Sequence, residues 1–217
     1  LARVKSHLSL VDVRRLEKSY HQAIRMIGEA VHFNNQFFAG DSLRIAVWAK
    51  MLSQELGYSE SEASLLEQAS VMHDAGNVGI PATIFSKPDL LDETERKKIQ
   101  HHPIIGHMIL SKSQAPVFEL ASTIALHHHE RWDGLGYPSG IRGTSIPLSA
   151  RIVAVVDAFN AILTDKPYRK GRSLEIAVQE IADNSGTQFD PDVVDAFLRI
   201  QPKIQKHLQD MAEVSVH

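Results

Sequence analysis

The chain has 217 residues, of which 43% are hydrophobic and 23% charged, values typical of a soluble protein with one main core. Its formal net charge of −3 argues against binding to a long nucleic acid. The absence of cysteine excludes a disulfide scaffold and suits a reducing compartment. Since it also lacks an apolar run of about 18 residues, we expect no membrane span and a cytoplasmic location.

Helical periodicity begins at the N-terminus. Over residues 4–31 apolar side chains recur every three to five positions, which predicts a long helix with an apolar seam. Such a seam can pack on its own domain or pair two copies as a coiled coil, and the heptads are too irregular to decide. We expect residues 1–33 to form a linker helix, through which a homodimer could form, and residues 34–217 to form the main domain.

Two helices are expected next. Residues 42–56 read as a helix with Asp41 or Ser42 as its N-cap, because short polar side chains accept hydrogen bonds from the free amides of a first turn. Ser59 and Glu62 then have the spacing of a capping box, which predicts a second helix that runs to the His-Asp pair at residues 73 and 74.

The rest of the chain is also helical in pattern, so the predicted class is all-α. Residues 92–112 form a helix that should be disturbed at His102, because the residue before a proline avoids helical geometry. A glycine-rich loop is expected between residues 130 and 147. Further helices are expected at residues 116–129, 149–164, 173–184 and 191–211, the last interrupted near Pro202.

Histidines are concentrated in the middle of the chain, near the ends of predicted helices. Imidazole is the commonest metal ligand, and histidine with aspartate but no cysteine favours a borderline or hard cation. A lone His-Asp pair more often means a buried histidine beside a capping aspartate, but the joint occurrence favours a metallohydrolase. Seven of the twelve histidines lie within residues 73–129: His73, His101, His102, His107, His127, His128 and His129.

Asp157 lies in an otherwise apolar helix, within the segment RIVAVVDAFNAIL. A buried carboxylate without a partner costs several kcal/mol, so this side chain requires a compensating group. A metal cation is the strongest such group. A salt bridge or hydrogen-bond network with a neighbouring helix is the alternative.

Long ordered motifs over roughly residues 30–200 resemble the HD-GYP family of metal-dependent phosphodiesterases. They are HDAGNVGIP, HHPIIG, HHERWDGLGYP, IPLSARIVAVVDAFN and DKPYR. The resemblance implies an all-helical HD-domain bundle that hydrolyses cyclic di-GMP to pGpG or GMP, or acts on a mixed cyclic GMP-AMP dinucleotide. It implies that two divalent transition metals, Fe or Mn or else Ni or Zn, are held by six residues: His73, Asp74, His102, His128, His129 and Asp157.

The resemblance also implies residue roles. Asp74 would bridge two cations about 3.5–4 Å apart, which hold a bridging hydroxide and clamp the phosphodiester. Tyr137 resembles a family tyrosine near the substrate phosphate, although it could simply fill its glycine-rich loop. Lys166 and Arg169 match positions that bind phosphate.

The chain departs from the family at three positions. Asp41 replaces a usual histidine and is either an oxygen ligand or, as we slightly favour, a helix cap. Phe37 stands where some members have a carboxylate for a third metal, so two metals are expected. Asn77 replaces a usual lysine of the catalytic site, and a neutral amide is no useful proton donor, which predicts weak catalysis or an altered substrate preference.

Two further readings follow from the same residues. The first ten residues resemble the end of a response-regulator receiver domain, which implies control by phosphorylation in two-component signalling. The departures at residues 41 and 77 leave open a second function, in which a degenerate domain binds the nucleotide, or a partner such as a diguanylate cyclase domain, without hydrolysis.

Overall fold

The predicted all-α class is confirmed. The computed structural model describes residues 2–32, 41–87, 89–165 and 170–214, and within these ranges the regular elements are helices, apart from one isolated bridge between Ser185 and Phe189. Among the described helices, none combines the length and apolar character that crossing a bilayer requires. In chain order the elements are α1 (Ala2–His32), α2 (Asp41–Glu55), α3 (Glu60–Ser70), the 3-10 helix η2 (Ala75–Gly79), α4 (Ala82–Phe85), α5 (Glu93–Ile99), α6 (His102–Leu110), α7 (Pro116–His127), the 3-10 helix η3 (Gly143–Ser145), α8 (Leu148–Leu163), α9 (Leu174–Asp183) and α10 (Pro191–Val214).

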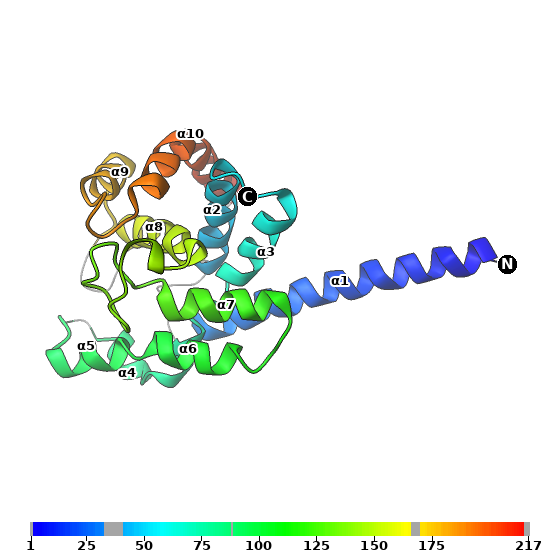
Figure 1. Ribbon diagram of the computed structural model, residues 1–217, viewed down its shortest axis with the longest axis horizontal. Helices are drawn as coiled ribbons and strands as arrows, with labels where there is room; N and C mark the ends of the chain where they lie inside the picture. The colour runs from blue at the N-terminus through cyan, green and yellow to red at the C-terminus, as the bar shows by residue number, and fades with distance from the viewer. Residues whose placement is uncertain (1, 33–40, 88, 166–169, 215–217) are drawn as a thin grey trace.

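The long helix α1 projects from the bundle, with the N-terminus at its far end (Figure 1). Its C-terminal part packs on the body, where Ile24 is buried and Gly28 lies directly against Val71. Farther out, Val13 and Leu16 are 52% and 72% exposed, so part of the apolar seam has no partner within the described chain. The predicted long helix is therefore present, whereas its role as a linker and the homodimer stay predictions.

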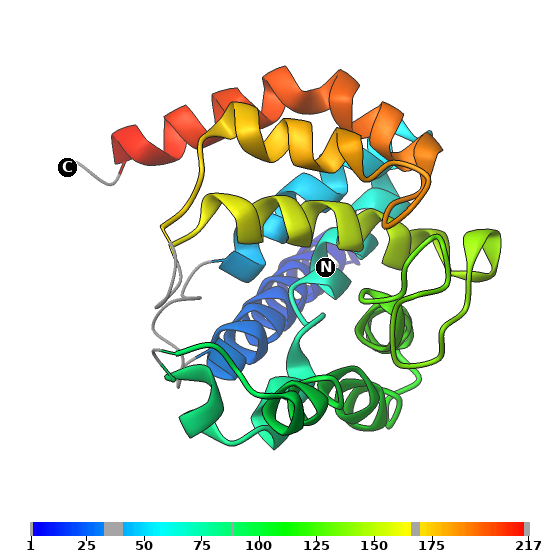
Figure 2. The same cartoon turned by 90° about the vertical axis from the view of Figure 1, so that its left-hand side faces the viewer.

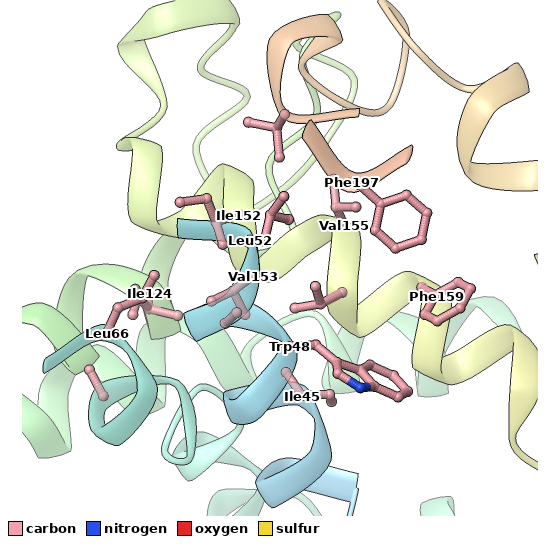
Figure 3. Close-up of a cluster of buried hydrophobic side chains, with 14 of the residues drawn as sticks. Ile45, Trp48, Leu52, Leu66, Ile124, Ile152, Val153, Val155, Phe159 and Phe197 are labelled. Carbon is pink, nitrogen blue, oxygen red and sulfur yellow. The ribbon is translucent and has the colours of Figure 1, made fainter. Parts of the chain in front are cut away.

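An aromatic cluster joins α2, α8 and α10 at the centre of the core (Figure 3). The ring of Phe159 lies 5.3 Å from the ring of Trp48 and 4.9 Å from that of Phe197, both in edge-on geometry. All three side chains are fully buried. Because successive residues are about 100° apart around a helix, Asp157 lies nearly opposite Phe159, and burial of Phe159 turns Asp157 away from this core.

The segment predicted as one disturbed helix forms two helices, but the break lies at Gln100 and His101, and His102 itself is helical although it precedes a proline. A capping box between Asp92 and Glu95 starts α5, which ends before His101, and α6 begins at His102 with Pro103 in its first turn. Proline is tolerated there because the amides of the first turn have no partner within the helix. The break places His102 at a helix start.

The predicted interruption near Pro202 is wrong, because α10 continues through this residue to Val214. A proline removes one backbone hydrogen bond and crowds the preceding turn, but packing can hold the helix together. Ile200 and Ile204, on either side of it, are both fully buried in the core. Tertiary packing has here overridden a local preference.

Elements far apart in sequence come together through glycine. η2, at the end of the segment that carries His73 and Asp74, lies against α6 in the lower part of the bundle (Figure 2). A Cβ atom built on Gly76 would lie 1.9 Å from the backbone oxygen of His102, a distance no real side chain tolerates. Gly76 therefore allows these two segments to approach.

We predict that Gly76→Ala destabilises the protein by at least about 1–3 kcal/mol, because the added methyl group meets backbone rather than a movable side chain. Urea unfolding of both proteins measures the change. Gly79→Ala is the matched control from the same short helix, since its Cβ would meet only the side chain of Ile105. Equal losses in the two variants would contradict this explanation.

Candidate metal centre

Four predicted ligands come together where three chain segments end. Asp74 follows α3 and caps η2, His102 opens α6, and His128 and His129 directly follow α7. Each of the four side chains offers a ligand atom within 4.8 Å of the others. Within the described residues this group has the composition of a binding site for a borderline or hard cation.

The two oxygens of Asp74 face different imidazoles. Oδ1 lies 3.2 Å from Nε2 of His102 and 3.6 Å from Nε2 of His128. Oδ2 lies 3.7 Å from Nε2 of His73. A carboxylate whose two oxygens face different imidazoles has the arrangement expected of a group that bridges two cations.

Asp157 of α8 joins the cluster through His73. Its Oδ1 atom lies 3.8 Å from His73 Nε2. All six residues of the predicted ligand set therefore lie close together. Four of them form the tight group, and His73 and Asp157 lie beside it, with His73 next to Asp74 and Asp157 next to His73. Their role as ligands stays a prediction.

Backbone carbonyls fix the orientation of three imidazoles. Nδ1 of His73 lies 2.8 Å from the oxygen of Ser70, and Nδ1 of His102 lies 2.8 Å from that of Ile99. His128 Nδ1 lies 3.0 Å from the oxygen of Ala125. A carbonyl oxygen can only accept, so each Nδ1 carries a proton, and in the neutral ring each Nε2 then presents a lone pair to Asp74.

The same geometry tests whether a cation fits. Nε2 of His102 lies 3.3 Å from Nε2 of His128. With both Nδ1 atoms protonated, two lone pairs face each other in a buried space beside a carboxylate. Such an arrangement is repulsive unless a positive charge lies among these atoms, so the donor set fits a divalent metal.

Electrostatics favours the ligand forms of these groups. Burial lowers the pKa of His129 well below its ordinary value, and the neighbouring His128 and His102 add to the effect. Burial also lowers the pKa of His128. Burial alone would raise the pKa of Asp74, but the surrounding imidazoles outweigh it and hold this pKa well below its usual range. Burial alone would lower the pKa of His102 as well, but hydrogen bonding to Asp74 outweighs it and raises this pKa. The cluster therefore offers a carboxylate together with the neutral imidazoles of His128 and His129 near neutral pH.

Tyr137 covers the cluster. Its ring stacks on His129 at 4.8 Å, and its amide donates to the His129 carbonyl oxygen at 3.1 Å. The buried carboxylate of Glu130 holds the same loop, because it accepts a hydrogen bond from the amide of Ser139 at 2.8 Å. Burial raises the pKa of Tyr137, with help from the charges of Asp74 and Asp157, so its hydroxyl stays protonated.

Asp41 and Asn77 are not among the four clustered side chains, and the remaining predicted residues lie outside the described chain. Asp41 Oδ1 accepts a hydrogen bond from Arg44 at 2.6 Å, so it has a cation of its own. The side-chain oxygen of Asn77 is buried and has no hydrogen-bond partner among the described residues. Lys166, Arg169 and Phe37 lie outside the described residues.

The sequence analysis missed a cavity of about 430 Å³ beside the cluster. His128, His129 and Asp157 line one part of it together with Tyr137. Four polar side chains that were not predicted as site residues line it as well: Gln100, Glu130, Arg131 and Gln188. The motif HHERWDG includes Arg131, whereas nothing in the sequence pattern singled out the two glutamines.

Comparison with known proteins identifies the family. Residues 25–193 match the family described as HD domain. The chain is 35% identical over 197 residues to the cyclic di-GMP phosphodiesterase response regulator RpfG of Xanthomonas campestris pv. campestris, covering 91% of this chain and 52% of that protein. It is 34% identical over 189 residues to 3'3'-cGAMP-specific phosphodiesterase 2 of Vibrio cholerae, covering 87% of this chain and 36% of that protein.

A solved structure supports the fold. The crystal structure of a cyclic GMP-AMP specific phosphodiesterase of Vibrio cholerae, V-cGAP3, superposes with a TM-score of 0.67 at 20% identity, covering 91% of this chain and 53% of that one. The chain thus spans about half or less of the length of these proteins. It belongs to the HD-GYP family of HD-domain proteins.

We predict that a divalent transition metal stabilises the metal-stripped protein through His102. At a metal concentration 100-fold above Kd, binding adds about 2.7 kcal/mol, which for a chain of this size raises Tm by about 5–10 °C. Differential scanning fluorimetry with Mn²⁺ measures this shift, and His102→Ala should lose most of it.

The adjacent His101→Ala is the matched control, because His101 is exposed and its Nδ1 lies against the Lys97 carbonyl oxygen rather than in the cluster. It should keep the shift of the unmodified protein. A shift of the same size in His102→Ala would show that Mn²⁺ binds elsewhere.

Proposed function

We propose that this chain is a metal-dependent phosphodiesterase that hydrolyses cyclic dinucleotides. The observation that carries the proposal is the orientation of His73, His102 and His128, whose Nε2 atoms all face one partly buried carboxylate, that of Asp74. The names of the relatives support the substrate class, because they describe phosphodiesterases of cyclic di-GMP and of 3'3'-cGAMP.

The six clustered residues would hold two divalent cations. When bound, such cations supply Lewis-acid stabilisation of a phosphodiester and a water-derived nucleophile near neutral pH. Asp74 contributes one oxygen to each side of the cluster, while the hydrogen bonds from Nδ1 to backbone carbonyls keep the imidazoles in their ligand tautomer. We propose Fe or Mn, with Ni or Zn as alternatives that the donor set also accepts.

Tyr137 acts as a hydrogen-bond donor in this proposal. Its protonated hydroxyl can donate to a nonbridging phosphate oxygen, where negative charge grows in the transition state. Stacking on His129 holds the ring in place without any adjustment when substrate arrives. Lys166 and Arg169 are proposed to add positive charge near the phosphate, from positions that lie outside the described residues.

Turnover of two substrates tests the function. With Mn²⁺ or Fe²⁺ present, we expect hydrolysis of both bis-p-nitrophenyl phosphate and cyclic di-GMP, and chromatography of the products separates pGpG from GMP. His102→Ala should lower kcat at least about 100-fold, while His101→Ala should not. Binding of cyclic di-GMP without turnover by the metal-loaded protein would instead support the alternative of a nucleotide receptor.

We predict that Asn77→Lys raises kcat for cyclic di-GMP by about tenfold or more. Asn77 lies three residues after Asp74, and its buried side-chain oxygen has no partner to lose. A cation there can stabilise the leaving oxygen, which a neutral amide does poorly, and acid assistance typically contributes 10²–10⁴-fold. Steady-state kinetics measures the change.

Asn77→Gln controls for the added length, since it keeps the neutral amide, and should not gain activity. Metal content is measured for each variant. An unchanged kcat in Asn77→Lys at equal metal content would rule out this role for residue 77.

A further inference from the structure

The cavity beside the candidate metal centre extends beyond the proposed catalytic residues. Its volume of about 430 Å³ is typical of small-ligand sites and exceeds the need of one phosphate group. One wall is a face of α8 that presents Ala154, Ala158 and Ala161, spaced four and three residues apart. Leu135, which is 80% exposed, borders the cavity from the glycine-rich loop.

Small methyl groups and a leucine make this part of the cavity apolar without filling it. A flat aromatic ring packs well on such a surface, as a nucleobase does when it lies between apolar side chains. The apolar surface alone selects no particular base. Selection requires polar groups at the edge of the ring.

Arg131 and Gln188 supply polar groups at this cavity. Asp133 holds the guanidinium at two points, with Nε to Oδ1 at 3.1 Å and an Nη to Oδ2 at 2.6 Å. The other Nη donates to the side-chain oxygen of Gln188 at 3.2 Å. The backbones are also joined, because the amide of Trp132 donates to the Gln188 carbonyl oxygen at 3.1 Å. The pair is therefore built into the fold.

This bonding decides which atoms remain for a ligand. A guanidinium only donates, so it is the amide oxygen of Gln188 that faces Arg131, and the amide N–H groups of Gln188 remain available. The Nη of Arg131 that binds Gln188 has a second N–H. The pair consequently offers donors. The carboxylate of Glu130 also belongs to the cavity lining, but it is fully buried and accepts a hydrogen bond from the amide of Ser139.

We propose that Arg131 and Gln188 recognise the O6 and N7 acceptor edge of a guanine base of the bound dinucleotide. The inference rests on the proposed function, because it places the scissile phosphodiester at the cluster around Asp74. Guanine presents two acceptors on this edge, whereas adenine presents N7 and the donor N6 amino group. Adenine would therefore leave a buried donor facing another donor.

Gln188→Glu tests the assignment. The carboxylate keeps an oxygen for Arg131 and has nearly the same shape, but it replaces the available donor with an acceptor. We expect the unmodified protein to prefer cyclic di-GMP over cyclic di-AMP by about 5- to 100-fold, the discrimination of one good base contact. The variant should lose most of this preference.

The measured quantity is the ratio of kcat/KM for cyclic di-GMP to that for cyclic di-AMP, or the corresponding ratio of Kd values if the chain binds without turnover. A ratio cancels a general effect of the new charge on phosphate binding. Gln188→Met removes the donor without adding charge and should lower the ratio as well. Gln205→Glu, on the exposed surface of α10, is the control for charge and should keep it.

The outcomes separate this inference from the proposed function. A preference for guanine that falls in both Gln188 variants supports the inference, even if bis-p-nitrophenyl phosphate is not hydrolysed and the phosphodiesterase proposal fails. Equal use of the two dinucleotides by the unmodified protein overturns the inference, as does an unchanged ratio in both variants. Hydrolysis of bis-p-nitrophenyl phosphate without binding of either dinucleotide also overturns it, while phosphodiester hydrolysis stands.

Discussion

The tautomer of three buried imidazoles governs the chemistry of this protein. Each of His73, His102 and His128 donates a hydrogen bond from Nδ1 to a backbone carbonyl oxygen near a helix end. This leaves three Nε2 lone pairs around the carboxylate of Asp74, all directed inward and largely shielded from water. Buried polar atoms that cannot bond one another require a compensating charge, so the backbone geometry itself creates the demand for a cation.

The helical bundle maintains that geometry through close contacts of residues that are not themselves predicted ligands. Gly76 lets the backbone after the His-Asp pair touch the start of α6, and the buried ring of Phe159 fixes the rotation of α8 and thus the direction of Asp157. The core and the cluster are therefore coupled. A change in helix packing moves ligand atoms by distances that matter to coordination, although the residue changed need not contact a metal.

Most helices and the six clustered residues could be predicted, because period, caps and motif order are local signals. Pro103 predicted an interruption of residues 92–112, although the break lies at Gln100 and His101 and His102 itself is helical. The interruption predicted at Pro202 does not occur, because Ile200 and Ile204 are buried against helices that are distant in sequence, and the sequence pattern near Pro202 does not reveal this packing. The pairing of Arg131 with Gln188 could not be predicted either, because it joins two loops 57 positions apart and neither residue type is informative alone.

Asp41, which stands where the family usually has histidine, shows how one position of the site can differ while the cluster around Asp74 is kept. Arg44 donates to Asp41, to Asn160 at 2.7 Å and to Thr164 at 3.1 Å, so these side chains tie α2 to the end of α8. The Oδ1 atom of Asp41 is thus paired with a guanidinium, whereas its Oδ2 atom is buried without a hydrogen-bond partner among the described residues; the carboxylate of Asp74 is instead surrounded by imidazoles. A carboxylate with its own fixed cation attracts a metal weakly, and this favours a structural role for Asp41 in which the cluster around Asp74 acts without it.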